Sequence, residues 1–212
     1  MKNNINTSIL NMEVSYGLQY NGFVDYGKDI VIEDGNIIPI EGFTGELTLF
    51  QKRQIGTYFN VTASIRLGGR NYLELGHSRT MNQGTYDGGV TFPNVTEVIV
   101  EDFQLRHRNI YFKLGYKRLL IKNKAAIQIG LVDMYFQQSE VNIWPDGQQV
   151  LIKERNYENS YLGEFGAYLG FQYDFYESGK FTLGARSTAY VIVSAGIDFE
   201  TLALAPYLRY NF

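Results

Sequence analysis

Apolar and polar residues alternate with a period of two along most of this chain. Residues 201–212 show the pattern most clearly, because their odd positions carry small or polar side chains. Their even positions are apolar or aromatic, namely Leu202, Leu204, Pro206, Leu208, Tyr210 and Phe212. Successive side chains of a β-strand point to opposite faces. The pattern therefore predicts a strand with one apolar face and one crowded, polar face.

Seven earlier segments follow the same alternation. We expect strands around residues 12–23, 59–67, 73–78, 98–120, 127–133, 161–175 and 181–193. Short turn sequences lie at residues 68–71, 122–124 and 177–179, whereas the other connections, at 25–51, 81–94, 143–147 and 195–198, are mostly longer. Short and longer connections alternate along the chain. This order predicts an all-β, eight-stranded antiparallel up-and-down barrel.

The polarity of the strands decides which solvent surrounds the barrel. A soluble lipocalin-like barrel encloses an apolar interior, but the crowded faces here carry the polar side chains. The reverse arrangement is typical of a transmembrane β-barrel, which must also be closed because an open edge leaves amides unpaired in hydrocarbon. No run of eighteen apolar residues occurs, so a transmembrane helix is excluded.

One residue breaks the predicted outer face. Asp133 continues the outward positions set by Ile127, Ile129 and Leu131, and a charge facing lipid is costly. A β-bulge inserts one residue and shifts the phase of a strand. We therefore expect a bulge near Val132 that turns Asp133 away from the lipid.

Composition narrows the picture further. The chain has 212 residues, which we interpret as a single domain 1–212, with Gly 22, Tyr 17, Phe 14 and only Pro 4. Cysteine is absent, and two histidines are too few for a zinc site, so no metal or other cofactor is expected. The net charge of -3 and the lack of a basic run argue against nucleic acid. Residues 1–7 lack a signal peptide's apolar core, so we interpret the sequence as a mature form.

The closing strand with its terminal Phe212, together with the alternation along the whole chain, carries a resemblance to a known group. The chain resembles small eight-stranded outer-membrane proteins of the OmpA transmembrane-domain or OmpX type, and its aromatic-rich composition is similar to Bacteroidota examples. The resemblance implies a bacterial outer-membrane location and contact with membrane lipid and lipopolysaccharide. It also implies that Tyr210 and Phe212 help the barrel assembly machinery to recognise the chain.

Charged residues of both signs fall on the predicted inner face. An eight-stranded barrel is just wide enough for its own side chains, and buried charges must be paired. We therefore predict an ion-pair network that plugs the lumen, with a gated ion path as the alternative. Inward glycines, among them Gly115 and Gly184, are expected to make room for it. The predicted members are Glu13, Arg66, Glu74, Lys113, Lys117, Glu164, Arg186 and Arg209.

The sequence favours a non-enzymatic role through the outer loops or the lipid-facing wall, as a surface protein or an accessory subunit of a larger outer-membrane complex. Trp144, in a predicted loop tip, is a candidate partner contact. The alternative is a lipid A-modifying enzyme. In a lipid A deacylase of similar barrel type, an outward His and an outward Ser lie two residues apart. Here His77 and Ser78 are adjacent, so they are predicted to face opposite sides of the strand. His107, between two arginines, is expected at the outer rim.

Overall fold

The computed structural model describes residues 8–21, 55–90, 98–120, 124–143, 150–154, 163–194 and 197–212. Nine strands form in these ranges. Their bounds are β1 Leu10–Asn21, β2 Ile55–Gly68, β3 Asn71–Val90, β4 Val98–Leu119, β5 Ala125–Ile143, β6 Val150–Glu154, β7 Gly163–Ser178, β8 Phe181–Ile192 and β9 Asp198–Asn211.

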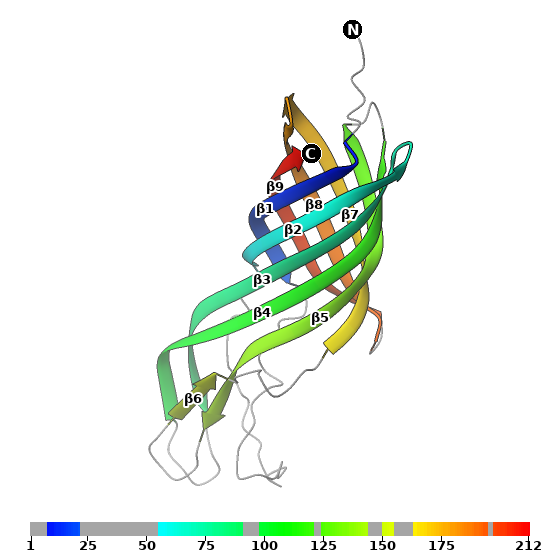
Figure 1. Ribbon diagram of the computed structural model, residues 1–212. Coiled ribbons are helices and arrows are strands. Elements are labelled where there is room, and N and C mark those ends of the chain that lie inside the picture. Colours follow the sequence, from blue (N-terminus) through cyan, green and yellow to red (C-terminus); the bar gives the residue numbers. More distant parts are fainter. Residues whose placement is uncertain are drawn as a thin grey trace.

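Eight of these strands close into an antiparallel barrel (Figure 1). Each barrel strand pairs with the next, β5 pairs with β7, and β1 pairs with β9 to complete the ring. β6 lies outside the ring and pairs only with the outer part of β5. The predicted eight-stranded up-and-down barrel is therefore confirmed.

Tight turns join the strands at one end of the barrel. Gly69 and Gly179 occupy the β2–β3 and β7–β8 turns with φ values of 54° and 58°, a left-handed conformation that favours glycine. The first residues of β1 pair with the last residues of β9 at this same end. This end is the predicted short-turn side.

The strands are staggered around the barrel. A row of cross-strand neighbours that starts at Leu183 of β8 returns to β8 at Val193, ten residues further along the strand. Strands in such staggered barrels tilt by roughly 35–45° from the barrel axis. Neighbours in a row therefore climb toward the outer end from one strand to the next. The row runs through Leu208, Val14, Val61, His77, Phe112, Asp133 and Phe165.

The distribution of polarity is inverted relative to a soluble protein. Outward side chains are apolar and exposed, for example Leu75 at 66% and Leu204 at 63% of their surface. Inward polar side chains are buried, and Asn60, Ser64 and Thr201 have no exposed surface. The described residues include no helix long and apolar enough to cross a membrane.

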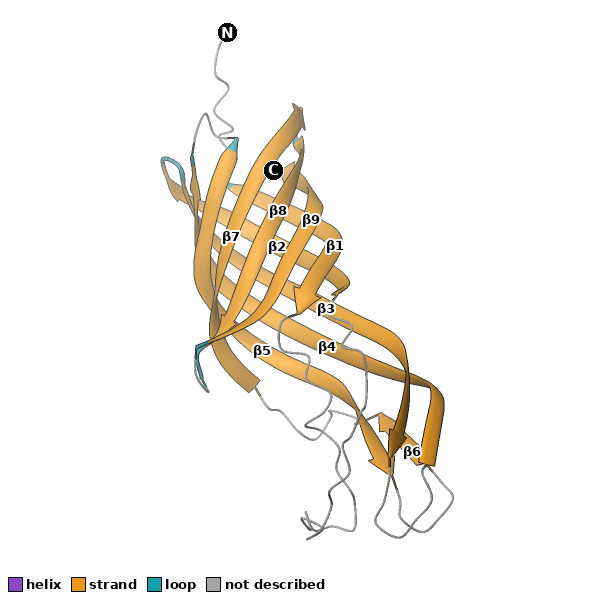
Figure 2. Ribbon diagram, turned by 180° about the vertical axis from the view of Figure 1, so that it is seen from behind, coloured by secondary structure: helices purple, strands orange, loops and turns teal. Residues whose placement is uncertain are grey.

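The long central strands continue beyond the barrel (Figure 2). β3 and β4 stay paired as far as Val90 and Val98, and β5 continues to Ile143 beside β6. Residues 81–90 were predicted to be loop, which is wrong. Alternation weakens there because the extension no longer separates a lumen from an apolar wall. The predicted loops at 25–51 and 144–147, with Trp144, lie outside the described residues.

Asp133 faces outward without a bulge. β5 pairs with both β4 and β7 in continuous register through this position, so the predicted phase shift is wrong. Val132 and Met134 are each only 2% exposed and pack with the lumen tyrosines. A phase shift would expel one of them. Asp133 instead accepts a hydrogen bond of 2.8 Å from the Tyr135 hydroxyl on the outer face.

Candidate functional site

Arg186 of β8 lies at the centre of the lumen network. Its Nη1 donates to Glu13 Oε1 at 2.7 Å, and its Nη2 donates to Gln128 Oε1 at 3.3 Å. Gln172 Nε2 also donates to Glu13 Oε1, at 2.6 Å. All four side chains are only 1% exposed. Because β1 and β5 lie on opposite sides of the ring, these contacts cross the lumen.

Glu74 of β3 extends the same network. Gln128 Nε2 donates to both of its carboxylate oxygens, at 3.0 and 2.7 Å, and Ser64 Oγ donates at 3.0 Å. Lys117 Nζ forms an ion pair with Glu74 Oε1 at 3.1 Å. One carboxylate thus collects a cation, an amide and a hydroxyl from three strands.

A third ion pair lies nearer the short-turn end. Arg209 of β9 pairs with Asp174 of β7, and the Tyr207 hydroxyl donates to the same carboxylate. Asp174 falls on the inward positions of its strand but was not among the predicted network members. Its inward position was a sufficient signal.

Lys113 is the exceptional cation. Its ammonium donates to Asn60 Oδ1 and lies over the Tyr168 and Tyr190 rings, 5.5 and 6.0 Å from their centroids. Among the described residues no carboxylate lies within ion-pair distance of it. Amide and ring faces therefore stabilise this charge.

A layer of buried tyrosines lies in the lumen on the outer side of the charges. Tyr111 stacks on Tyr190 with ring centroids 4.1 Å apart, and the Tyr58 and Tyr190 hydroxyls lie 3.1 Å apart. The Tyr190 hydroxyl donates to Ser78 Oγ at 3.0 Å. These rings are at most 1% exposed. None of these tyrosines was among the predicted site residues, although the period of two places their side chains on the inward face.

The outer end of the lumen holds a carboxylate among amides. Asn109 and Asn21 donate to Glu200 Oε1 at 2.5 and 3.2 Å. Glu164 of β7 is half-buried at this end and acts electrostatically on Glu200. It lies apart from the Arg186 network into which it was predicted.

Arg66 does not join the lumen network. Its guanidinium donates twice to the Gly69 carbonyl, at 3.0 and 2.8 Å, in the exposed β2–β3 turn. The residue is on the inward phase, but it lies at the end of β2, where the side chain reaches the rim. Alternation along a strand shows only that a side chain points to the inner face. Its distance from the strand end decides whether it is enclosed in the lumen.

Inward glycines lie against the bulky lumen side chains. A Cβ on Gly115 would overlap the Tyr168 hydroxyl and lie 2.8 Å from the Ile129 carbonyl oxygen. A Cβ on Gly184 would lie 2.5 Å from the Tyr207 ring. The absent side chains therefore make room for the aromatic residues, as the sequence predicts.

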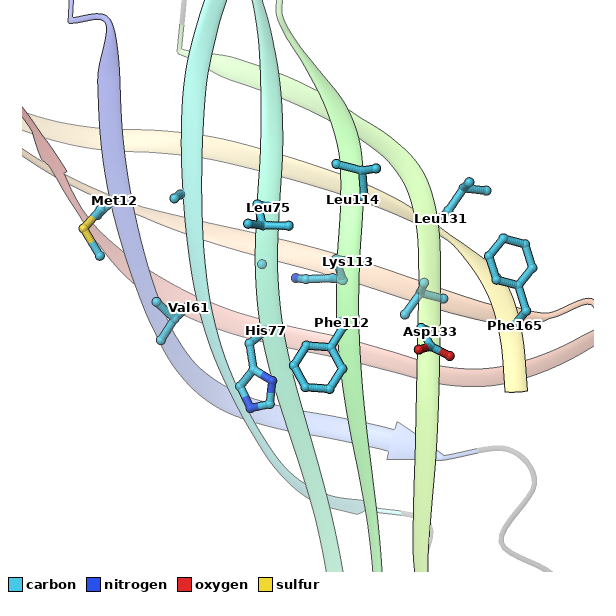
Figure 3. Close-up of a pocket in the computed structure, with 13 residues that line it drawn as sticks. Met12, Val61, Leu75, His77, Phe112, Lys113, Leu114, Leu131, Asp133 and Phe165 are labelled. Atoms are coloured by element: carbon cyan, nitrogen blue, oxygen red, sulfur yellow. The ribbon is translucent and has the colours of Figure 1, made fainter. Parts of the chain in front are cut away.

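The outer wall carries an apolar groove of about 540 Å³ (Figure 3), which runs across the strands from β1 to β7. His77 lies on its outer rim, tilted against Phe112 with ring centroids 5.1 Å apart. The side of the groove toward the short turns is formed by Met12, Ala63, Leu75, Leu114 and Leu131. The side toward the outer end is formed by Val61, His77, Phe112, Asp133 and Phe165.

Ser78 is on the other side of the wall from His77. It has no exposed surface and donates to Asn60 Oδ1 at 2.9 Å within the lumen. The outward strand neighbours of His77 are Leu75 and Arg79. His77 thus has an acid in its row, Asp133, but neither of its outward neighbours on β3 carries a hydroxyl. In the described ranges no group of three metal-ligating side chains gathers.

The predicted assembly residues lie on the outer wall. Tyr210 and Phe212 contact edge to face, with ring centroids 4.8 Å apart, and Phe181 contacts Tyr210 at 5.2 Å. His107 lies in the outer part of β4, where it pairs with Asn82 and Gln138. The aromatic cluster is therefore at the short-turn end, and His107 at the other.

No protein-family model and no curated protein matches the sequence. Neisserial surface protein A matches with a TM-score of 0.51 and 10% identity, over 97% of this chain and 98% of that chain. The chain has the fold of a small eight-stranded outer-membrane β-barrel. At such low identity the likeness to these solved structures concerns the fold alone.

Two other solved outer-membrane barrels match less well. The attachment invasion locus protein Ail of Yersinia pestis, in complex with the heparin analogue sucrose octasulfate, has a TM-score of 0.47 and 7% identity over 95% of this chain and 97% of its own. OprG of Pseudomonas aeruginosa has a TM-score of 0.46 and 9% identity over 97% and 98%. The resemblance to Bacteroidota examples stays a prediction.

Proposed function

We propose that this chain is a non-enzymatic protein of the bacterial outer membrane, a single barrel domain with a plugged polar lumen. It acts through its extracellular loops or lipid-facing wall, as a structural or surface-interaction protein or as an accessory subunit of a larger outer-membrane complex. Its surroundings are membrane lipid and lipopolysaccharide, and nucleic acid is no partner.

The proposed plug is supported mainly by a chain of side-chain contacts across the lumen. Glu13, Arg186, Gln128 and Glu74 come from four strands and bond to one another while almost fully buried. The tyrosine layer adds a second closure. A conducting path would need charges that face water rather than each other.

Conductance tests the plug directly. In planar bilayers the wild-type protein is expected to show no steady conductance. Replacing Arg186 and Glu74 together by alanine should produce conducting steps, and Arg66→Ala, at the exposed turn, serves as the control. Steady wild-type conductance would contradict the plug.

The enzyme alternative receives its own test. The burial of Ser78 supports the non-enzymatic proposal, because a serine nucleophile must reach lipid A from the outer wall. Mass spectrometry of lipid A from cells that express the wild type or His77→Ala should show the same acyl chains in both. Lipid A that lacks an acyl chain in cells with the wild type, but not in cells with His77→Ala, would establish the enzyme.

Co-purification distinguishes the two non-enzymatic roles. Extraction from native outer membranes in mild detergent should recover a larger barrel in fixed proportion if the chain is an accessory subunit. Recovery without such a partner supports a free-standing surface protein. Trp144→Ala tests the proposed loop contact, since a partner held by that loop would be lost.

We also propose that Tyr210 and Phe212 are read by the barrel assembly machinery. Phe212→Ala should lower the amount of barrel assembled in cells while leaving refolding in detergent unchanged. Phe181→Ala removes a ring from the same cluster on another strand and is the matched control. Equal losses for both variants would indicate packing instead of recognition.

A further inference from the structure

The apolar wall is much shorter on β3 than on β8. The outward positions of β8 and the residues after it carry no charge from Phe181 to Val193. On β3 only Leu73 and Leu75 precede His77 and Arg79. An apolar band in these barrels is about 25 Å tall. Arg79 therefore lies at a level where other strands still face hydrocarbon.

β5 shows the same shortening with the opposite charge. Asp133 follows Ile127, Ile129 and Leu131 on its outer face. Asp133 accepts a hydrogen bond from the Tyr135 hydroxyl. Among the described residues, no cation lies within ion-pair distance of Asp133, and no acid lies within ion-pair distance of Arg79. Ionisable groups facing hydrocarbon are costly unless paired. Among the described residues, Arg79 and Asp133 thus face outward from this wall without an ion-pair partner.

The stagger of the barrel brings these charges to nearly equal height. The row from His77 to Asp133 crosses two strands and climbs about 6 Å toward the outer end. Arg79 is two residues beyond His77 on β3, which raises it by about 5 Å. Arg79 and Asp133 therefore flank β4 at the same level, one on each side.

β4 provides an apolar centre between the two charges. Ile110 pairs with Arg79, and Phe112 pairs with Asp133, so these two side chains occupy the middle of the face. Phe112 is 52% exposed. A two-fold interface needs this arrangement, in which a patch is complementary to itself.

We propose that a second copy of this chain docks on the β3–β5 wall. The two-fold axis of this dimer runs parallel to the barrel axis, outside the wall, at a point between Ile110 and Phe112. It sets Arg79 of each copy opposite Asp133 of the other. Two ion pairs then flank an apolar contact, and the uncompensated charges leave the lipid. This inference rests on the membrane setting proposed above and extends that function by naming a partner.

Cross-linking at the axis tests the dimer. The chain has no cysteine, so Ile110→Cys introduces a unique thiol. Packed sheets lie about 10 Å apart, too far for a disulfide, so a short bifunctional thiol reagent is applied to native outer membranes. The control is Leu204→Cys on β9, on the opposite side of the ring and 63% exposed. We expect a cross-linked dimer from Ile110→Cys and none from Leu204→Cys.

Charge reversal then tests the pairing. In the Ile110→Cys background, Arg79→Asp or Asp133→Arg alone should lower the cross-linked fraction at least tenfold. The double reversal restores the pairs and should recover most of it. Single reversals without effect, or a double variant no better than either single one, would overturn the pairing.

The remaining outcomes are also decisive. No Ile110→Cys dimer, equal dimer from both thiols, or cross-linking to a different protein would overturn the second copy as occupant. Heat-dependent gel mobility of each variant checks that the barrel has folded. A wild-type chain that is not heat-modifiable or not in the outer membrane would refute the membrane setting, whereas a folded, inserted monomer refutes only the dimer.

Discussion

Arg186 of β8 and Glu13 of β1 form an ion pair of 2.7 Å inside the lumen, with both side chains 1% exposed. Breaking a buried pair leaves an uncompensated charge and costs about 3–5 kcal/mol. Arg186→Met should therefore lower the free energy of unfolding by about this amount. Denaturant titration of the barrel in lipid vesicles measures it.

Arg66 provides the matched control. Its guanidinium contacts a turn carbonyl in an exposed position, so Arg66→Met should change the free energy of unfolding by about 0.5 kcal/mol or less. Equal effects of the two substitutions would show that burial does not set the cost.

Lys113 should behave differently from Arg186. Methionine keeps the long apolar stem of the lysine and removes an ammonium that faces an amide and two rings instead of a carboxylate. Lys113→Met strands no buried anion, so we expect a smaller loss than for Arg186→Met in the same titration. A larger loss would mean that the Lys113 charge stabilises a lumen carboxylate from beyond ion-pair distance.

Gly115 should tolerate no side chain. Alanine there overlaps the Tyr168 hydroxyl and crowds the β5 backbone, so Gly115→Ala should destabilise the barrel by about 1–3 kcal/mol. Gly163→Ala is the control, because its Cβ would meet the Tyr135 ring at an ordinary 3.5 Å. The midpoint of denaturant unfolding compares them, and similar midpoints would refute the packing argument.

The cost of an outward charge should depend on depth. Leu204, in the middle of β9, and Leu67, beside the β2–β3 turn, are exposed to 63% and 61%. Leu204→Arg should cost about 2–4 kcal/mol in vesicles, and Leu67→Arg about 0–1 kcal/mol. Equal costs would contradict a membrane around this wall.

Much of the barrel could be predicted because lipid and lumen impose opposite polarities on alternate residues. The closing strand shows this, since Ala203 and Arg209 are buried while Leu202 and Leu208 are exposed, as their positions predict. The prediction that a bulge turns Asp133 inward was wrong. It weighed only the cost of a charge that faces lipid, whereas the inward packing of Val132 and Met134 fixes the phase of β5.

Pairing inside the lumen could be predicted only in part. Alternation places Arg66 and Arg186 on the same face, but only Arg186 lies far enough from a strand end to be enclosed. Which acid meets which base depends on the stagger, and it is the stagger that brings Arg209 of β9 to Asp174 of β7, two strands away. A single sequence specifies no stagger.

The seam between β1 and β9 sets Asn11 opposite Asn211, residues separated by nearly the whole chain. Contacts this distant in sequence are the slowest to form, and until they form both flanking strands have open edges. The chain therefore gains little by folding as it is synthesised. Closure is therefore a late step, and a shortened chain that lacks β9 yields no smaller barrel, only one with an unsealed edge.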